Sequence, residues 1–229
     1  MSPFNLNSGT AAADRLFGTF RAETLNGLAG NDTILAGGGH DLIYGNGREG
    51  GFGDDLAGRG NNLIFAGLGN DTIFAGYQAD TVHGGDGNDS IDGAGVFASS
   101  GAGGSITAAR DFGDLLDGGA GQDRIDGEGG NDTLIGGTGN DTLIGNLGRE
   151  EMAGGRGHDV FEFAFRTAPG VFASDTGTNA ATRDVILDFA RTRTGSTCTP
   201  MPTGPTGRMR RSSSAPKTSP ETTRCRSAR

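Results

Sequence analysis

Residues 118–163 read GGAGQDRIDGEGGNDTLIGGTGNDTLIGNLGREEMAGGRGHDVFEF, a stretch in which the pattern small-small-x-Gly-x-Asp-x-apolar-x returns every nine residues. The glycines of each unit allow left-handed turns, and the residues after them alternate polar and apolar as a short strand does. One unit therefore predicts one turn and one short strand. Two units make an eighteen-residue circuit, and the strands of successive circuits stack in parallel with the position-eight residue pointing inward.

The phase of this pattern persists through fourteen units along the chain. Position eight is apolar in all fourteen, and position six is Asp in eleven, Glu in two and Asn in one. The two positions read Asp14/Leu16, Glu23/Leu25, Asp32/Ile34, Asp41/Ile43, Asn62/Ile64, Asp71/Ile73, Asp80/Val82, Asp89/Ile91, Asp114/Leu116, Asp123/Ile125, Asp132/Leu134, Asp141/Leu143, Glu150/Met152 and Asp159/Phe161. A glycine-rich coil shaped by composition alone would not keep this phase.

These units resemble the RTX nonapeptide G-G-x-G-x-D-x-U-x, the hemolysin-type calcium-binding repeat. The resemblance implies an all-β, right-handed parallel β-roll that holds several Ca²⁺ ions in the gaps between stacked turns. The implied metal ligands are Asp32, Asp41, Asp71, Asp80, Asp89, Asp114, Asp123, Asp132, Asp141 and Asp159. Glu23, Asn62 and Glu150 depart from the aspartate of the motif, and Gln78 and Phe112 replace a position-four glycine.

The charge of the repeat region favours metal binding over the ordinary role of aspartate in turns. A single Asp in a glycine-rich turn caps its own backbone in most loops. Residues 1–190, however, carry ten basic and twenty-seven acidic side chains, a net charge of −17. Capping requires no such accumulation of like charge, which repels itself unless cations enter. The same charge disfavours nucleic acid and anionic membranes as direct partners.

Breaks in the repeat phase divide the chain. We expect an N-terminal cap with worn repeats (1–25), a first stack (26–92) with a break at 45–58 that interrupts the ion ladder, and an insertion loop (93–113) between two stacks. A second stack and closing strand (114–165) follow. Residues 166–190, with RDVILDFA at their end, resemble the region after the repeats in serralysin-like secreted proteins.

The remaining motifs argue against an enzyme and for export. His40, His83 and His158 form no H-E-x-x-H, and the G-x-G-x-x-G at Gly45 precedes no helix-forming sequence. The family resemblance implies an extracellular protein released by a type I secretion exporter, since no Sec-type signal peptide or membrane-spanning run is present. The alternative is a C-terminal export and folding module cut from a larger RTX enzyme, such as a protease, lipase or epimerase.

The tail, residues 191–229, has a different composition from the rest of the chain. It is rich in Arg, Ser, Thr and Pro, holds Cys198 and Cys225, and lacks an apolar period. Such a composition predicts disorder. Reading its codons from the third base permits alternating, strand-like sequences, so we also hypothesise that a frameshift produced this tail, in which case the chain would be retained in the cell.

Overall fold

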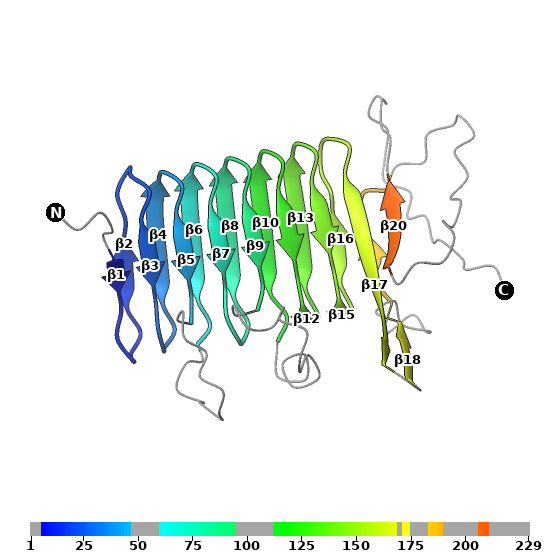
Figure 1. The fold of residues 1–229 in the computed structure, drawn as a ribbon, viewed down its shortest axis with the longest axis horizontal. Helices are drawn as coiled ribbons and strands as arrows, with labels where there is room; N and C mark the ends of the chain where they lie inside the picture. Colours follow the sequence, from blue (N-terminus) through cyan, green and yellow to red (C-terminus); the bar gives the residue numbers. More distant parts are fainter. Residues whose placement is uncertain are drawn as a thin grey trace.

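Two large parallel sheets run the length of the molecule, facing each other across a narrow core (Figure 1). The structure is a computed structural model and describes residues 6–46, 60–94, 112–168, 171–174, 183–189 and 206–210. Every regular element in these ranges is a β-strand. None of the described residues belongs to a helix that is long and apolar enough to cross a membrane.

The chain alternates between the two large sheets. The 10-stranded sheet contains, in order, β1 (Leu6–Ser8), β3 (Thr24–Asn26), β5 (Leu42–Tyr44), β7 (Thr72–Phe74), β9 (Ser90–Asp92), β11 (Arg124–Asp126), β14 (Thr142–Ile144), β17 (Val160–Ala168) and β18 (Val171–Ser174), with β20 (Thr206–Arg210) also paired to β17. The 8-stranded sheet contains β2 (Arg15–Phe17), β4 (Thr33–Gly38), β6 (Leu63–Leu68), β8 (Thr81–Asp86), β10 (Leu115–Ala120), β13 (Thr133–Thr138), β16 (Glu151–Ala153) and β19 (Val185–Ile186). A small sheet pairs β12 (Gly129–Gly130) with β15 (Leu147–Gly148).

The register confirms the predicted parallel β-roll. Leu116 lies beside Leu134 in one sheet, and Ile125 lies beside Leu143 in the other, so equivalent residues of neighbouring circuits pair with each other. The eighteen-residue step between them is the length of two repeat units, as the sequence predicts. Each circuit therefore contributes one strand to each sheet.

The core is the column of position-eight side chains. All fourteen predicted inward residues are buried in one apolar cluster, and three alanines, Ala36, Ala66 and Ala75, lie among them. The largest side chain of the column, Phe161 in β17, is 1% exposed and stands at its C-terminal end. Phe163 and Ile186 pack against the same end.

The two predicted stacks form one continuous body. Strands on either side of residues 93–113 pair directly, β8 with β10 and β9 with β11. Across the earlier break, β4 pairs with β6 and β5 with β7. The register of both sheets is therefore continuous across the two breaks. The break over 45–58 falls largely outside the described residues.

The C-terminal strands close the roll at one end. β17 continues the parallel sheet through β14 and pairs in antiparallel fashion with β18 and β20. β20 lies within residues 191–229, where composition predicted no regular structure; the rest of that range is outside the described residues. Because β18 and β20 both pair with β17, this strand of the roll is not left as an open edge.

Candidate metal centre

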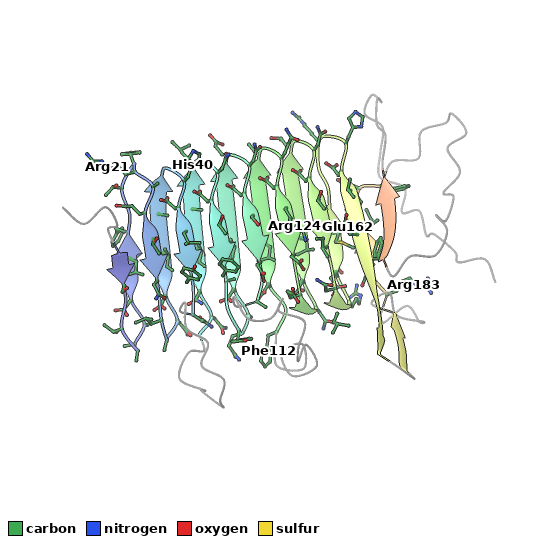
Figure 2. All side chains as sticks on the ribbon, viewed as in Figure 1. Arg21, His40, Phe112, Arg124, Glu162 and Arg183 are labelled. Carbon is green, nitrogen blue, oxygen red and sulfur yellow. The ribbon has the colours of Figure 1, made fainter. Side chains whose placement is uncertain are left out.

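The turns between the large sheets form two edges along the stack. We call the edge whose turns lead from the 8-stranded to the 10-stranded sheet the regular edge, and the opposite one the interrupted edge, because both breaks in the repeat phase fall there. In Figure 2 Arg21 and His40 lie on the regular edge and Phe112 lies on the interrupted edge. Position six is occupied on the regular edge by Glu23, Asp41, Asp71, Asp89, Asp123, Asp141 and Asp159, and on the interrupted edge by Asp14, Asp32, Asn62, Asp80, Asp114, Asp132 and Glu150.

Hydrogen bonds connect the position-six residues of each edge into a ladder. The backbone amide of Asp123 donates to Oδ1 of Asp141 at 2.9 Å, and the amide of Asp114 donates to Oδ1 of Asp132 at 2.9 Å. The same bond links the rungs on either side of the first break, since the amide of Asp41 donates to Oδ1 of Asp71 at 2.7 Å. The hydrogen-bond ladder therefore continues across this break, and it does so on the interrupted edge as well, where the amide of Asp32 donates to Oδ1 of Asn62 at 3.0 Å.

In seven aspartates of the ladder the second carboxylate oxygen carries no hydrogen bond. Oδ2 is buried and accepts none in Asp32, Asp41, Asp71, Asp89, Asp123, Asp132 and Asp141. Asp80, Asp114 and Asp159 occupy the same ladder position, each accepting the amide of the preceding rung through Oδ1. A buried charged oxygen without a donor is costly, so each such atom indicates a missing cationic partner.

A backbone carbonyl faces the same space as several of these oxygens. A Cβ built onto Gly136 would lie 2.6 Å from Oδ2 of Asp141 and 2.6 Å from the carbonyl oxygen of Gly154, one circuit further on. Two oxygens therefore surround a point that any side chain at this glycine would fill. At Gly127 the same construction meets Oδ2 of Asp132 at 2.7 Å and the carbonyl oxygen of Gly145 at 3.1 Å. The glycine at position one leaves the cradle open in these two units, whereas Ala36, Ala66 and Ala75 stand at that position in the units of Asp41, Asp71 and Asp80.

The carboxylates of the ladder resist ionisation without a cation. Burial raises the pKa of Asp89 to about 7, with the neighbouring Asp123 and Asp71 carboxylates adding to the rise and the backbone amide of Asp71 opposing it. Burial likewise raises the pKa of Asp132 to about 7 and that of Asp141 to about 6. A divalent cation would reverse this effect, because it favours the charged form of every carboxylate that it touches.

The donor set fits Ca²⁺. This ion takes six to eight oxygens from carboxylates and carbonyls, and the cradles present both kinds. Among the described residues no three His, Cys, Asp or Glu side chains gather into one cluster. Backbone carbonyls of the turns must therefore supply a large share of the ligands, which suits a hard cation and not a thiolate- or imidazole-binding metal.

In the first circuit the position-six carboxylates cap their own turns instead. Oδ2 of Asp14 accepts hydrogen bonds from the backbone amide and the hydroxyl of Thr10, at 2.5 and 2.8 Å. Thr19 donates in the same way to the two carboxylate oxygens of Glu23, at 2.5 and 3.1 Å. Here the carboxylates satisfy their own turns, so the N-terminal circuit differs from the rungs above it.

Asp184 is a ladder residue that the repeat pattern did not identify. The amide of Glu150 donates to its Oδ1 at 3.2 Å, its Oδ2 is buried, and the side chain of Glu150 lies within hydrogen-bonding reach of its carboxylate. Burial raises the pKa of Asp184. No glycine motif precedes it, and the only signal in the sequence is its spacing of two residues from Ile186, which packs against the core as a position-eight residue would.

The turn backbones differ between the two edges. On the regular edge the left-handed position is glycine in circuit after circuit, for example Gly37 and Gly137, with φ of 100° and 102°. On the interrupted edge non-glycine residues take up positive φ: Leu28, Gln78, Glu128 and Asn146. A side chain in this region costs roughly 1–2 kcal/mol, so the regular edge has the less strained turns.

Comparison with known proteins agrees with this geometry. A family model for the RTX calcium-binding nonapeptide repeat, four copies long, matches residues 17–47, 49–76, 56–91, 109–143 and 126–161. No curated protein matches the chain. The matched segments cover more than half of the sequence and include most of the position-six ladder. The chain therefore belongs to the RTX nonapeptide-repeat family, whose repeats bind calcium ions.

Proposed function

We propose that this protein is secreted and that its β-roll folds when several Ca²⁺ ions bind outside the cell. The supporting observation is the two rows of buried position-six carboxylates, most of them with an oxygen that no donor satisfies. The ligands that we assign are Asp32, Asp41, Asp71, Asp80, Asp89, Asp114, Asp123, Asp132, Asp141 and Asp159.

The narrow core explains why folding would depend on the ions. Each fully buried Ile or Leu contributes about 1.5–3 kcal/mol, whereas ordering a residue costs about 1–2 kcal/mol for its backbone alone. The column offers one large inward side chain for each nine-residue unit, with a few alanines between them. Burial of this column therefore does not offset the cost of ordering the chain, and repulsion between the stacked carboxylates destabilises the folded state further. Ion binding to the folded state alone supplies the missing free energy by mass action.

Calcium dependence in turn accounts for export. Extracellular calcium modules have dissociation constants of about 10⁻⁴–10⁻³ M, far above the calcium concentrations that cytosolic sensors detect. The chain would therefore stay unfolded in the cytosol and fold after release. An unfolded chain suits passage through a type I secretion exporter, which we propose as its partner in the producing cell.

A calcium titration of the full chain tests the proposal. We expect far-UV circular dichroism to show a largely disordered chain in EGTA and a β-sheet spectrum at millimolar Ca²⁺, with Mg²⁺ at the same concentration producing little change. Magnesium is the matched control because it demands near-octahedral geometry and gives up its water reluctantly. A full β-sheet spectrum in EGTA would contradict the coupling of folding to calcium.

We also assign Asp184 as a ligand of the last rung on the interrupted edge. Its Oδ2 is buried, and the fully buried side chain of Glu150, which precedes it in the ladder, approaches its carboxylate, so two acidic groups face one space. Asp184→Asn should reduce the number of bound calcium ions by one. Asp188→Asn is the control, because Asp188 instead accepts hydrogen bonds from the amides of Gly154 and Gly155, at 3.1 and 2.5 Å. An unchanged ion count in Asp184→Asn would remove this residue from the ligand set.

A further inference from the structure

One rung of the interrupted edge carries an amide in place of a carboxylate. Asn62 is 3% exposed and takes the ladder position between Asp32 and Asp80. Its backbone amide donates to Oδ1 of Asp80 at 2.6 Å, as the backbone amides of ladder aspartates do. The backbone hydrogen bond of Asn62 is thus the one that ladder aspartates make, and only the chemistry of its side chain differs.

The orientation of the Asn62 amide is set by its neighbours. The backbone N–H of Asp32 can only donate, and it points at Oδ1 of Asn62 at 3.0 Å. The amide nitrogen must therefore occupy the other side. There Nδ2 donates to Oδ1 of Asn46 at 2.5 Å and to the carbonyl oxygen of Ala75 at 3.2 Å. Both hydrogens of the amide thus have an acceptor, which a flipped side chain would lose.

This nitrogen occupies the place of the bare oxygen in other rungs. A Cβ built onto Gly45 would lie 2.7 Å from Nδ2 of Asn62, just as one on Gly136 would lie 2.6 Å from Oδ2 of Asp141. The carbonyl of Ala75 stands opposite, as that of Gly154 does in the Asp141 cradle. An N–H group that fills a cradle cannot ligate a cation, because it presents positive charge to the ion and consumes the carbonyl oxygen.

We propose that the Asn62 rung binds no calcium and is closed by the amide network of Asn62, Asn46 and Ala75. Asn46, which follows β5, completes this network. Its own Nδ2 donates to the carbonyl oxygen of Tyr77 at 3.0 Å. The row of ions on the interrupted edge is therefore divided at this rung, while the regular edge stays continuous. The inference rests on the proposed calcium function and specifies which rung of the ladder lacks an ion.

The same geometry predicts that one atom change creates a site. In N62D the carboxylate that replaces the amide, the Ala75 carbonyl and Oδ1 of Asn46 would present three oxygens to one space. We expect N62D to bind one more calcium ion per chain than the natural protein. N31D is the matched control, because Asn31 is an exposed turn residue of the same edge whose Oδ1 accepts the amide of Asn61 at 2.9 Å, a bond that an aspartate retains.

The experiment counts calcium bound to the full chain by equilibrium dialysis and elemental analysis. N62D should gain one ion, whereas N31D and N62A should keep the natural number. An unchanged count in N62D, or the loss of an ion in N62A, would overturn the inference, and the N62A result decides the question if N62D does not fold. A natural chain that binds no calcium would refute the proposed function itself, so the two failures are distinguishable.

Discussion

Replacing Asp141 by Asn should move the stability of the protein in opposite directions with and without calcium. Asp141 is fully buried on the regular edge, where its Oδ1 accepts the amide of Asp123 and its Oδ2 accepts no hydrogen bond. Asparagine keeps the acceptor at Oδ1. Its amide nitrogen would face the carbonyl of Gly154, as Asn62 faces Ala75. The variant therefore exchanges one cation site for a neutral amide.

The two expected changes are of similar size. At ~10 mM calcium and a dissociation constant of ~10⁻⁴ M, one ion stabilises the folded state by about 2.7 kcal/mol, which Asp141→Asn should lose. Without calcium, burial raises the pKa of Asp141 from 3.8 to about 6, and the ionised group at neutral pH then costs the folded state about 3 kcal/mol. Because asparagine carries no charge, Asp141→Asn should stabilise the calcium-free folded state by most of that amount.

Urea unfolding at saturating calcium measures the first change, and a folding titration with trimethylamine oxide in EGTA measures the second. Asp14→Asn is the control, because Thr10 already satisfies the second oxygen of Asp14 and no ion should be lost. A variant that is destabilised in both conditions would show a packing defect instead of a lost site. An unchanged calcium stoichiometry in Asp141→Asn would refute the reasoning directly.

Three further outcomes are expected. Because burial raises the pKa of Asp89 from 3.8 to about 7, the calcium-free folded state binds more protons than the unfolded chain, and its stability falls as pH rises through about 7. Circular dichroism in EGTA should thus show more β-sheet at pH ~5 than at pH ~8, and the reverse trend would contradict this sign. Gly139→Ala should destabilise the calcium-bound protein by more than about 3 kcal/mol in urea, because φ is +141° and the new Cβ would lie 1.4 Å from the carbonyl oxygen of Gly121. Leu143→Ala in the buried column should cost about 2–5 kcal/mol by the same assay, whereas Leu187→Ala, at a residue that is 53% exposed, should stay within about 0.5 kcal/mol; equal effects would contradict the assignment of the core.

The nine-residue period by itself determined the fold and its inward face. Since side chains in a strand alternate in direction, a fixed spacing of two residues places Asp141 and Leu143 on the same, inner face of the roll, with Asp141 in the turn before the strand and Leu143 in the core. The glycines determined where the turns lie. These local rules repeat in each unit, so the parallel β-roll and its stacked aspartates could be predicted without coordinates.

Only the tertiary structure decided which rungs of the ladder are alike. Asp14, Asn62 and Asp141 hold the same place in the repeat, yet Thr10 satisfies the first, Asn46 and Ala75 satisfy the second, and no donor reaches Oδ2 of the third. Asp184 joins the ladder without a glycine motif because β19 pairs with β16. These distinctions depend on contacts between circuits that lie 18, 30 or 34 residues apart, and a local motif carries no information about what a neighbouring circuit donates.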